Sequence, residues 1–218
     1  MASWIVHLRI ADKLLERFPF DEASFVVGSI APDCGRQNPD GLTYTPSKAV
    51  SHCTPDGTNA SIDYGGVYDA YIQKEEDPKA RAFPFGYLAH LVADKLWGET
   101  IFEPSYARYG KDFSDKASFV KAVKRDWYDL DSLYLSRHPD FHAYAVLTGI
   151  GRFEGEYLPF YPAEMINEKL ESIDLFYQTR QCNLSRTDYF YLAENEADSF
   201  VADAVALCTK VLQAYTGA

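Results

Sequence analysis

Residues 83–97 read FPFGYLAHLVADKLW, and this run is apolar on nearly every side of a helix. Helices of that composition pack in the protein interior. We therefore expect a buried helix over residues 83–102, entered through Pro84. Two of its residues, His90 and Asp94, are polar where the pattern calls for apolar side chains.

His90 and Asp94 are four residues apart, so they share one face of this helix and lie about 5–6 Å from each other. A buried carboxylate costs several kcal/mol unless it is paired or bound to a metal ion. The two side chains could bind one ion together. The pair taken alone fits a hydrogen bond inside the core equally well.

The rest of the chain is also dominated by helical periodicity. Helices are expected over residues 4–18, 22–30, 61–76, 114–135, 162–181 and 188–215, with Asp21 and Ser114 as caps. Residues 34–60 are rich in Gly, Pro, Asn, Ser and Thr and predict a long irregular loop, a kind of segment that is often functional. Strong strand alternation is absent. The sequence predicts an all-α fold, a multi-helix bundle in a single domain over residues 1–218.

The charge balance excludes several classes of partner. The 218 residues include 21 Lys+Arg and 32 Asp+Glu, which gives a net charge of −11. This argues against a basic nucleic-acid footprint and a polybasic membrane anchor, but not against cation binding.

No apolar run approaches the roughly 18 residues of a transmembrane helix. Charges from Arg9 to Arg17 interrupt any signal-peptide core, so we expect a cytoplasmic protein with reduced cysteines.

Three further polar residues stand out. His7 lies on the apolar stripe of the first predicted helix, Asp33 ends the second, and His52 lies in the irregular loop. Each alone fits an ordinary role: a core histidine bonded to a carbonyl, a helix-end cap and a surface histidine. Taken with His90 and Asp94 they make three imidazoles and two carboxylates. That set suits a pair of zinc ions with one bridging carboxylate.

Four stretches carry a resemblance to a known family. They are Ser3-Trp4 followed by HLRIA at 7–11, GSIAPD at 28–33, Ser51-His52, and GYLAHLVAD at 86–94, in this order. On these motifs the chain resembles the zinc-dependent phospholipase C family, whose fold is shared with the secreted fungal single-strand nucleases. The second half of the chain matches only as generic helices. The resemblance implies a mostly helical single domain.

The resemblance also implies a set of metal ligands. One zinc ion would be bound by Asp33, His52, His90 and Asp94. A second would be bound by His7 and Asp94, so that Asp94 bridges the two ions. Asp33 is the candidate for orienting or deprotonating the attacking water, because a ligand carboxylate can keep one oxygen free.

Two departures from the family pattern concern the number of ions. In secreted members a tryptophan is the mature N-terminus, and its free amine and carbonyl complete a zinc shell. Here Trp4 follows three residues, so an ion at His7 is expected to be weakly held, solvated or missing. The secreted enzymes hold a third zinc partly through a His and a carboxylate four residues apart. His142 is followed at that spacing by Val146, so no third site is expected at His138 and His142.

Together these features predict a metal-dependent hydrolase of phosphate esters, a phosphodiesterase or phospholipase C-like enzyme in which dinuclear zinc activates water. The expected substrate is a small phosphate ester or a phospholipid headgroup, not long nucleic acid. The alternative is a catalytically degenerate metal-binding or interaction protein of the same fold. A helical phosphohydrolase built on an adjacent His-Asp dipeptide is disfavoured, because that dipeptide does not occur. A purely structural helical protein would leave Asp94 without a partner.

Overall fold

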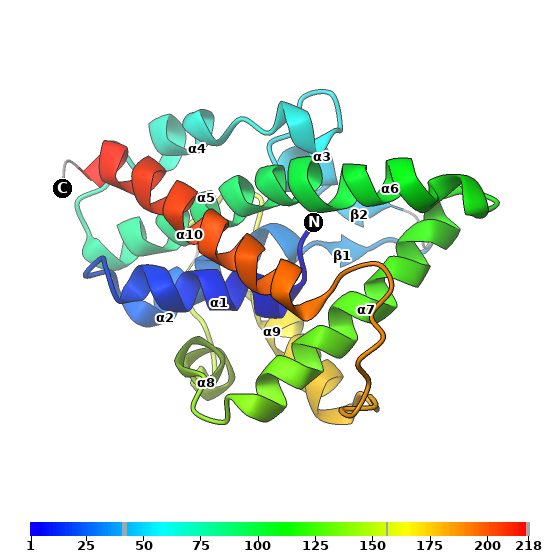
Figure 1. Cartoon of the computed structure of the whole chain (residues 1–218). Coiled ribbons are helices and arrows are strands. Elements are labelled where there is room, and N and C mark those ends of the chain that lie inside the picture. Colours follow the sequence, from blue (N-terminus) through cyan, green and yellow to red (C-terminus); the bar gives the residue numbers. More distant parts are fainter. Residues whose placement is uncertain (41–42, 156, 217–218) are drawn as a thin grey trace.

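The computed structural model describes residues 1–40, 43–155 and 157–216, and most of them are helical (Figure 1). The α-helices are α1 (Trp4–Leu15), α2 (Glu22–Gly28), α3 (Lys48–Ser51), α4 (Tyr64–Tyr71), α5 (Pro78–Trp97), α6 (Glu103–Tyr109), α7 (Lys116–Arg137), α8 (His142–Gly149), α9 (Ala163–Thr179) and α10 (Glu194–Thr216). The all-α prediction is confirmed. A single domain over the whole chain stays a prediction.

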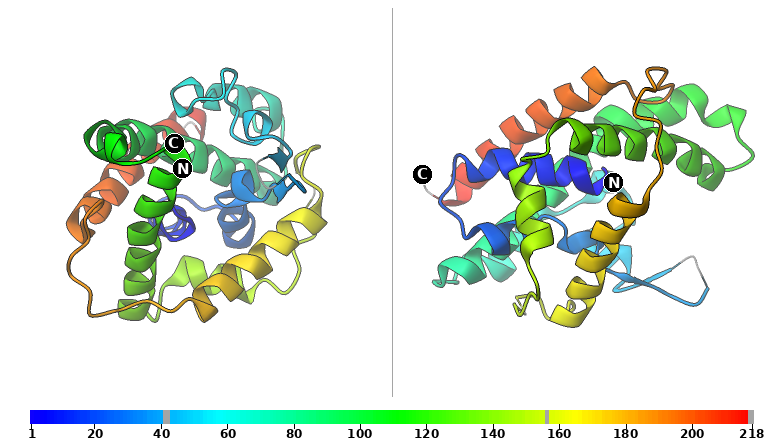
Figure 2. Two further views of the ribbon diagram at one scale, coloured as in Figure 1. Left: turned by 90° about the vertical axis from the view of Figure 1, so that its right-hand side faces the viewer. Right: turned by 90° about the horizontal axis from the view of Figure 1, so that it is seen from below.

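Short turns and one small hairpin complete the described structure. The turns are η1 (Ala31–Asp33), η2 (Asn59–Ser61) and η4 (Gly110–Asp112), which are 3-10 helices, and η3 (Gly98–Phe102), which is a π-helix. Strands β1 (Arg36–Gln37) and β2 (Tyr44–Thr45) pair in an antiparallel manner and project from the helices (Figure 2). No described helix is both long enough and apolar enough to cross a membrane.

Helix α5 is the buried centre of this arrangement, as its apolar composition predicts. From Ala82 to Asp94 every residue is buried, and the helix contacts α1, α2, α4 and α10. In Figure 1, α10 crosses in front of α1 and α5. Two apolar clusters form the core, one including Trp97 and the other Leu91, and α1 and α5 contribute to both. Residues on these two helices are therefore fixed by packing on more than one side.

Two glycines let α2 and α5 approach very closely. A Cβ atom at Gly28 would lie 2.0 Å from the Phe83 carbonyl oxygen, and one at Gly86 would lie 2.1 Å from the Phe25 carbonyl oxygen. These are backbone atoms that cannot move aside, so each position requires glycine. The close approach places the carbonyl of Ser29 2.8 Å from Nδ1 of His90.

Several helix boundaries differ from the prediction. Helix α5 begins at Pro78, because the Asp77 side chain caps it, and Pro84 lies inside the helix. The cap of α7 is Asp115 and not Ser114; the Asp115 carboxylate accepts a hydrogen bond from the Ser118 N–H at 2.7 Å. At α7 two neighbouring residues offered the same capping signal, and the chain uses the one whose side chain reaches the first turn.

Other differences concern short elements. The helix expected over 61–76 is limited to α4, and α1, α2, α9 and α10 are also shorter than expected. The described residues of the predicted loop over 34–60 are largely irregular but include β1, β2 and α3, and positions 41–42 of the loop lie outside the described residues. Helices α6 and α8 were not predicted. They have seven and eight residues, too few to show an apolar stripe clearly.

The tight α2–α5 contact yields a stability prediction. Gly86→Ala forces a methyl group into the Phe25 carbonyl and should lower the free energy of unfolding by about 3 kcal/mol. Gly149→Ala is the matched control, because nothing lies within 4 Å of a Cβ at Gly149. Urea denaturation of both variants measures the difference. Equal stability of the two variants would contradict the close contact.

Candidate metal centre

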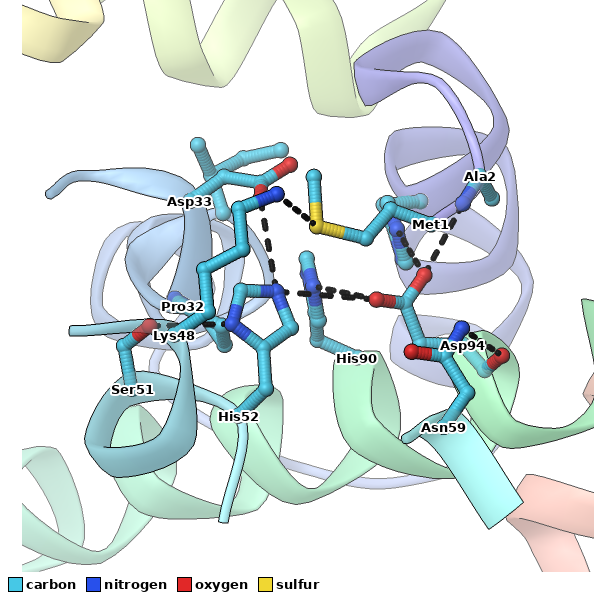
Figure 3. Close-up of polar contacts among 12 residues, drawn as sticks. Met1, Ala2, Pro32, Asp33, Lys48, Ser51, His52, Asn59, His90 and Asp94 are labelled. Atoms are coloured by element: carbon cyan, nitrogen blue, oxygen red, sulfur yellow. Dashed lines mark hydrogen bonds and ion pairs between the residues drawn. The ribbon is translucent and has the colours of Figure 1, made fainter. Parts of the chain in front are cut away.

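The structure brings all five predicted ligands together. His7 comes from α1, Asp33 ends η1, His52 follows α3 as its C-cap, and His90 and Asp94 lie one turn apart on α5. Figure 3 shows Asp33, His52, His90 and Asp94 pointing toward one another. Residues that are far apart in the sequence thus form a single cluster.

The Asp94 carboxylate lies between the three imidazoles. Its Oδ1 is 3.3 Å from His7 Nε2, and its Oδ2 is 3.6 Å from His52 Nε2 and 3.5 Å from His90 Nε2. Each oxygen therefore faces a different side of the cluster. This is the arrangement that a bridging carboxylate needs.

Asp33 joins the cluster through His52, with 3.4 Å between Asp33 Oδ1 and His52 Nε2. Two sets of possible ligand atoms lie within 4.8 Å of one another: His7 with His90 and Asp94, and Asp33 with His52 and His90. His90 belongs to both sets. The sequence assigned His90 to one ion only, and that assignment stays a prediction.

Several buried polar atoms in the cluster have no hydrogen-bond partner in the described structure. They are Nε2 of His7, His52 and His90, and Oδ2 of Asp94. A buried polar atom left unpaired costs about 1–3 kcal/mol, and more when the group is charged. These residues belong to the two ligand sets described above, where bound cations would satisfy their unpaired atoms. The donor set of imidazole nitrogens and carboxylate oxygens suits zinc.

The separations within the cluster also fit zinc. A tetrahedral zinc ion with bonds near 2.0–2.1 Å places its ligand atoms ~3.3 Å from each other. The four His–Asp separations are 3.3 to 3.6 Å. A direct N–H···O hydrogen bond is shorter, most often about 2.9–3.0 Å. The core hydrogen bond that the sequence left open as an alternative therefore fits these distances less well.

Hydrogen bonds at the far side of two imidazoles aim their Nε2 atoms. His90 Nδ1 lies 2.8 Å from the Ser29 carbonyl, which can only accept, so Nδ1 carries a proton and donates it. In the neutral ring this leaves a lone pair on Nε2. His52 Nδ1 lies 2.9 Å from the hydroxyl of Ser51. Metal-bound histidines are oriented in this way.

The electrostatics of the cluster favour a cation. Burial and the neighbouring His90 lower the pKa of His7 to about 4, so that its imidazole is neutral at pH 7. Burial alone would raise the pKa of Asp33, but the neighbouring His52 and His90 hold it below its usual value. Burial alone would lower the pKa of His90, yet Asp94, Asp33 and the Ser29 carbonyl together outweigh it and raise that pKa. A metal ion would take the place of the proton on His90.

Two tyrosines hold the ligand-bearing loops. The Tyr87 hydroxyl donates a hydrogen bond to the Ser51 carbonyl beside His52, and the Tyr161 hydroxyl donates to the Pro32 carbonyl beside Asp33 at 2.9 Å. The sequence analysis did not assign them this role. The one visible signal was that Tyr87 shares a helix with His90.

Asp131 fixes the start of α1. Its two oxygens accept hydrogen bonds from the Ser3 and Tyr177 hydroxyls, each at 2.6 Å. Burial raises the pKa of Asp131 to about 7 despite these bonds. Ser3 in turn caps α1, which carries His7. The Ala2 N–H donates to Asp94 Oδ1 at 2.9 Å, so this segment is tied directly to the centre.

Two cavities reach the cluster. The smaller cavity, about 260 Å³, is lined by Asp33 and His52, and the larger, about 500 Å³, by His52. His7, His90 and Asp94 lie beneath, with exposed fractions of 2%, 1% and 0%. Any small molecule therefore approaches the cluster from the side of Asp33 and His52.

His138 and His142 belong to neither ligand set found among the described residues. His138 Nδ1 lies 2.8 Å from the Tyr134 carbonyl, and His142 Nε2 lies 3.2 Å from the carboxylate of Glu22. Both histidines are exposed.

Comparison with known proteins places these residues in a family context. Residues 6–97 match the family model for zinc dependent phospholipase C, and this confirms the resemblance. The matched segment contains all five candidate ligands. It supports a metal-dependent, phospholipase-like hydrolase with zinc as its ion. Neither the curated proteins nor the solved structures gave a significant match.

The cluster predicts that zinc stabilises the fold. After chelation, zinc at 100 times its dissociation constant should add about 2.7 kcal/mol, or about 5–10 °C in Tm. His52→Gln should lose most of this shift because it removes a ligand, whereas the exposed His138→Gln should keep it. Thermal melts with and without zinc measure the effect. An unchanged Tm of the unsubstituted protein would count against the centre.

Proposed function

We propose that the chain is a zinc-dependent hydrolase of phosphate esters, a phosphodiesterase or a phospholipase C-like enzyme with a dinuclear centre. The observation that carries the proposal is the Asp94 carboxylate, with one oxygen toward His7 and the other toward His52 and His90. Metal pairs bridged in this way suit in-line displacement at phosphorus.

The residues divide between two ions in this proposal. Asp33, His52, His90 and Asp94 would hold one zinc ion, and His7 with Asp94 would hold the other. Bound zinc supplies Lewis acidity toward phosphate oxygens and lowers the pKa of water to about 7. The carboxylates would neutralise part of the metal charge, and the imidazoles would bind in their neutral form, so that binding displaces any proton on Nε2.

Asp33 is the proposed proton acceptor. Its side chain is 8% exposed and lines the smaller cavity, whereas Asp94 has no exposed surface. A water molecule arriving from the cavity therefore meets Asp33 before any other carboxylate of the centre. One oxygen of Asp33 faces His52, and the other is free to orient that water and take its proton.

The cavities give room for both substituents of a phosphodiester. Both are lined by His52, beside which the phosphate would lie, and they also share Met1, Lys48 and Lys124. The larger cavity has apolar walls from Phe102, Val120 and Trp127, which suit an acyl or aromatic substituent. A small phosphodiester and a phospholipid headgroup ester both fit, and the net charge of −11 disfavours long nucleic acid.

One observation favours the second candidate, a metal-binding or interaction protein of the same fold without turnover. His7, His90 and Asp94 line neither cavity, so a substrate reaches only part of the centre. A cytoplasmic location stays a prediction under either candidate.

Hydrolysis of bis(p-nitrophenyl) phosphate tests the proposal. With zinc bound, the protein should release p-nitrophenol, and Asp33→Asn should lower kcat by about 100-fold or more because a proton acceptor is lost. Asp203→Asn, an exposed change on α10, is the control and should leave kcat unchanged.

The possible results separate the two candidates. Zinc binding without turnover would favour the metal-binding protein. Turnover that survives Asp33→Asn would remove Asp33 from the reaction.

A further inference from the structure

Lysines gather at the smaller cavity although the chain as a whole is acidic. Lys48 on α3, Lys124 on α7 and Lys169 on α9 line it, with Asp33 as the one carboxylate among its described lining residues. The three lysines come from separate helices, so the fold and not a basic run in the sequence brings them together. Lys48 and Lys124 also line the larger cavity.

These three ammonium groups lack strong partners. Among the described residues, Lys13 is the lysine that lies within 4.0 Å of a carboxylate, and the other cations in such pairs are arginines and histidines. The Lys48 ammonium donates to the Met1 sulfur at 3.1 Å, which is a weak acceptor. Lys124 is half-buried, and both burial and the charge of Lys48 lower its pKa. An anion in the cavity would relieve this cost.

The scissile phosphate does not account for the lysines. Two zinc ions carry four positive charges, and Asp33 and Asp94 return two negative charges, so the centre keeps two positive charges. A phosphodiester carries one negative charge, which the centre already balances. The positive charge of the three lysines would therefore remain uncompensated when the phosphodiester is bound.

A cationic headgroup does not fit this cavity either. Aromatic side chains also line it, and aromatic faces can bind quaternary ammonium groups. Each of these rings already has a cation beside it: Lys48 lies 5.5 Å from the Tyr44 ring centroid, Lys169 lies 5.5 Å from Trp4, and Arg180 lies 5.5 Å from Tyr128. A further cation would meet like charges.

We propose that the phosphate ester taken by this centre carries a second anionic group, a carboxylate or phosphate on one of its alcohols, and that Lys48, Lys124 and Lys169 bind that group. The inference rests on the proposed function and narrows its substrate class. The second alcohol of the ester then occupies the larger cavity, against Trp127 and Phe102. An anionic phospholipid and a water-soluble ester share this chemistry.

Two p-nitrophenyl phosphodiesters with the same leaving group test the inference. In one ester the alcohol other than p-nitrophenol is glycolate, which is anionic and would face the lysines. In the other ester it is choline, which is cationic. The kcat/KM ratio should favour the glycolate ester by at least tenfold. Lys124→Gln with Lys169→Gln should lower that ratio at least tenfold, mainly through KM. A ratio near one in the unsubstituted protein would overturn the inference.

The controls separate charge at the cavity from charge elsewhere. Lys121→Gln removes the same charge from α7 at an exposed position outside both cavities and should keep the ratio. Lys48→Gln, an exposed single change, should lower the ratio even if the double variant does not fold. A ratio that falls equally in Lys121→Gln would contradict a specific role of the cavity.

A phosphodiester whose second alcohol carries no charge separates this inference from the proposed function. Methyl p-nitrophenyl phosphate should be hydrolysed equally by the unsubstituted protein and the lysine variants. If no ester is hydrolysed, the proposed function fails. A binding experiment with an inert dianion then tests the anion site by itself. Titration of the zinc-loaded protein with 1,3-propanedisulfonate should change the tryptophan fluorescence, because Trp4 lines the cavity, and the change should be lost in Lys48→Gln. An equal fluorescence change in the unsubstituted protein and in Lys48→Gln would contradict the anion site.

Comparing a monomeric phospholipid with the same phospholipid in a vesicle shows whether the anionic group comes from a lipid surface or from a water-soluble ester. Phosphatidylserine is offered as short-chain monomers in water and as vesicles diluted in phosphatidylcholine. Hydrolysis of either above phosphatidylcholine supports an anionic headgroup, and faster vesicle hydrolysis identifies a lipid surface as its source. Preference for phosphatidylcholine in both forms would overturn the inference.

Discussion

The burial of Asp94 is the constraint on which the rest of the structure depends. Its carboxylate has no exposed surface, and three imidazole nitrogens lie 3.3 to 3.6 Å from it. A carboxylate in such a place costs several kcal/mol unless positive charge compensates it. Helices α1, α3 and α5 are held so that their histidines meet this one group. The close α2–α5 contact at Gly28 and Gly86 serves the same end, because it orients His90 through Ser29.

Burial and access divide the ligands between two roles. His7, His90 and Asp94 are sealed and set the geometry of the centre, whereas Asp33 and His52 face the cavities and meet whatever enters. The sealed ligands are fixed by the packed core, and the two accessible ligands lie at its edge. Lysines from α3, α7 and α9 then give the smaller cavity a charge opposite to that of the whole chain.

The sequence predicted the helical fold, and three of the five cluster residues stand out in it because they break a local pattern. His90 and Asp94 are polar on an apolar helix, and His7 interrupts an apolar stripe. Such departures from a pattern can be read from the sequence alone. The supports of Tyr87 and Tyr161 were not predicted, because a tyrosine that packs and also donates a hydrogen bond looks like any other tyrosine. Lys124 and Lys169 were invisible for a related reason: their proximity is set by how α7 and α9 pack, not by spacing.

Zinc content tests the central claim, that the His–Asp cluster binds zinc, most directly. The full chain is purified without chelator, equilibrated with zinc and freed of unbound metal. Its zinc content is then measured by inductively coupled plasma mass spectrometry. The account predicts one to two zinc ions per chain, and less than half of that content in Asp94→Asn. A zinc content near zero in the unsubstituted protein, or an equal content in Asp94→Asn, would contradict it.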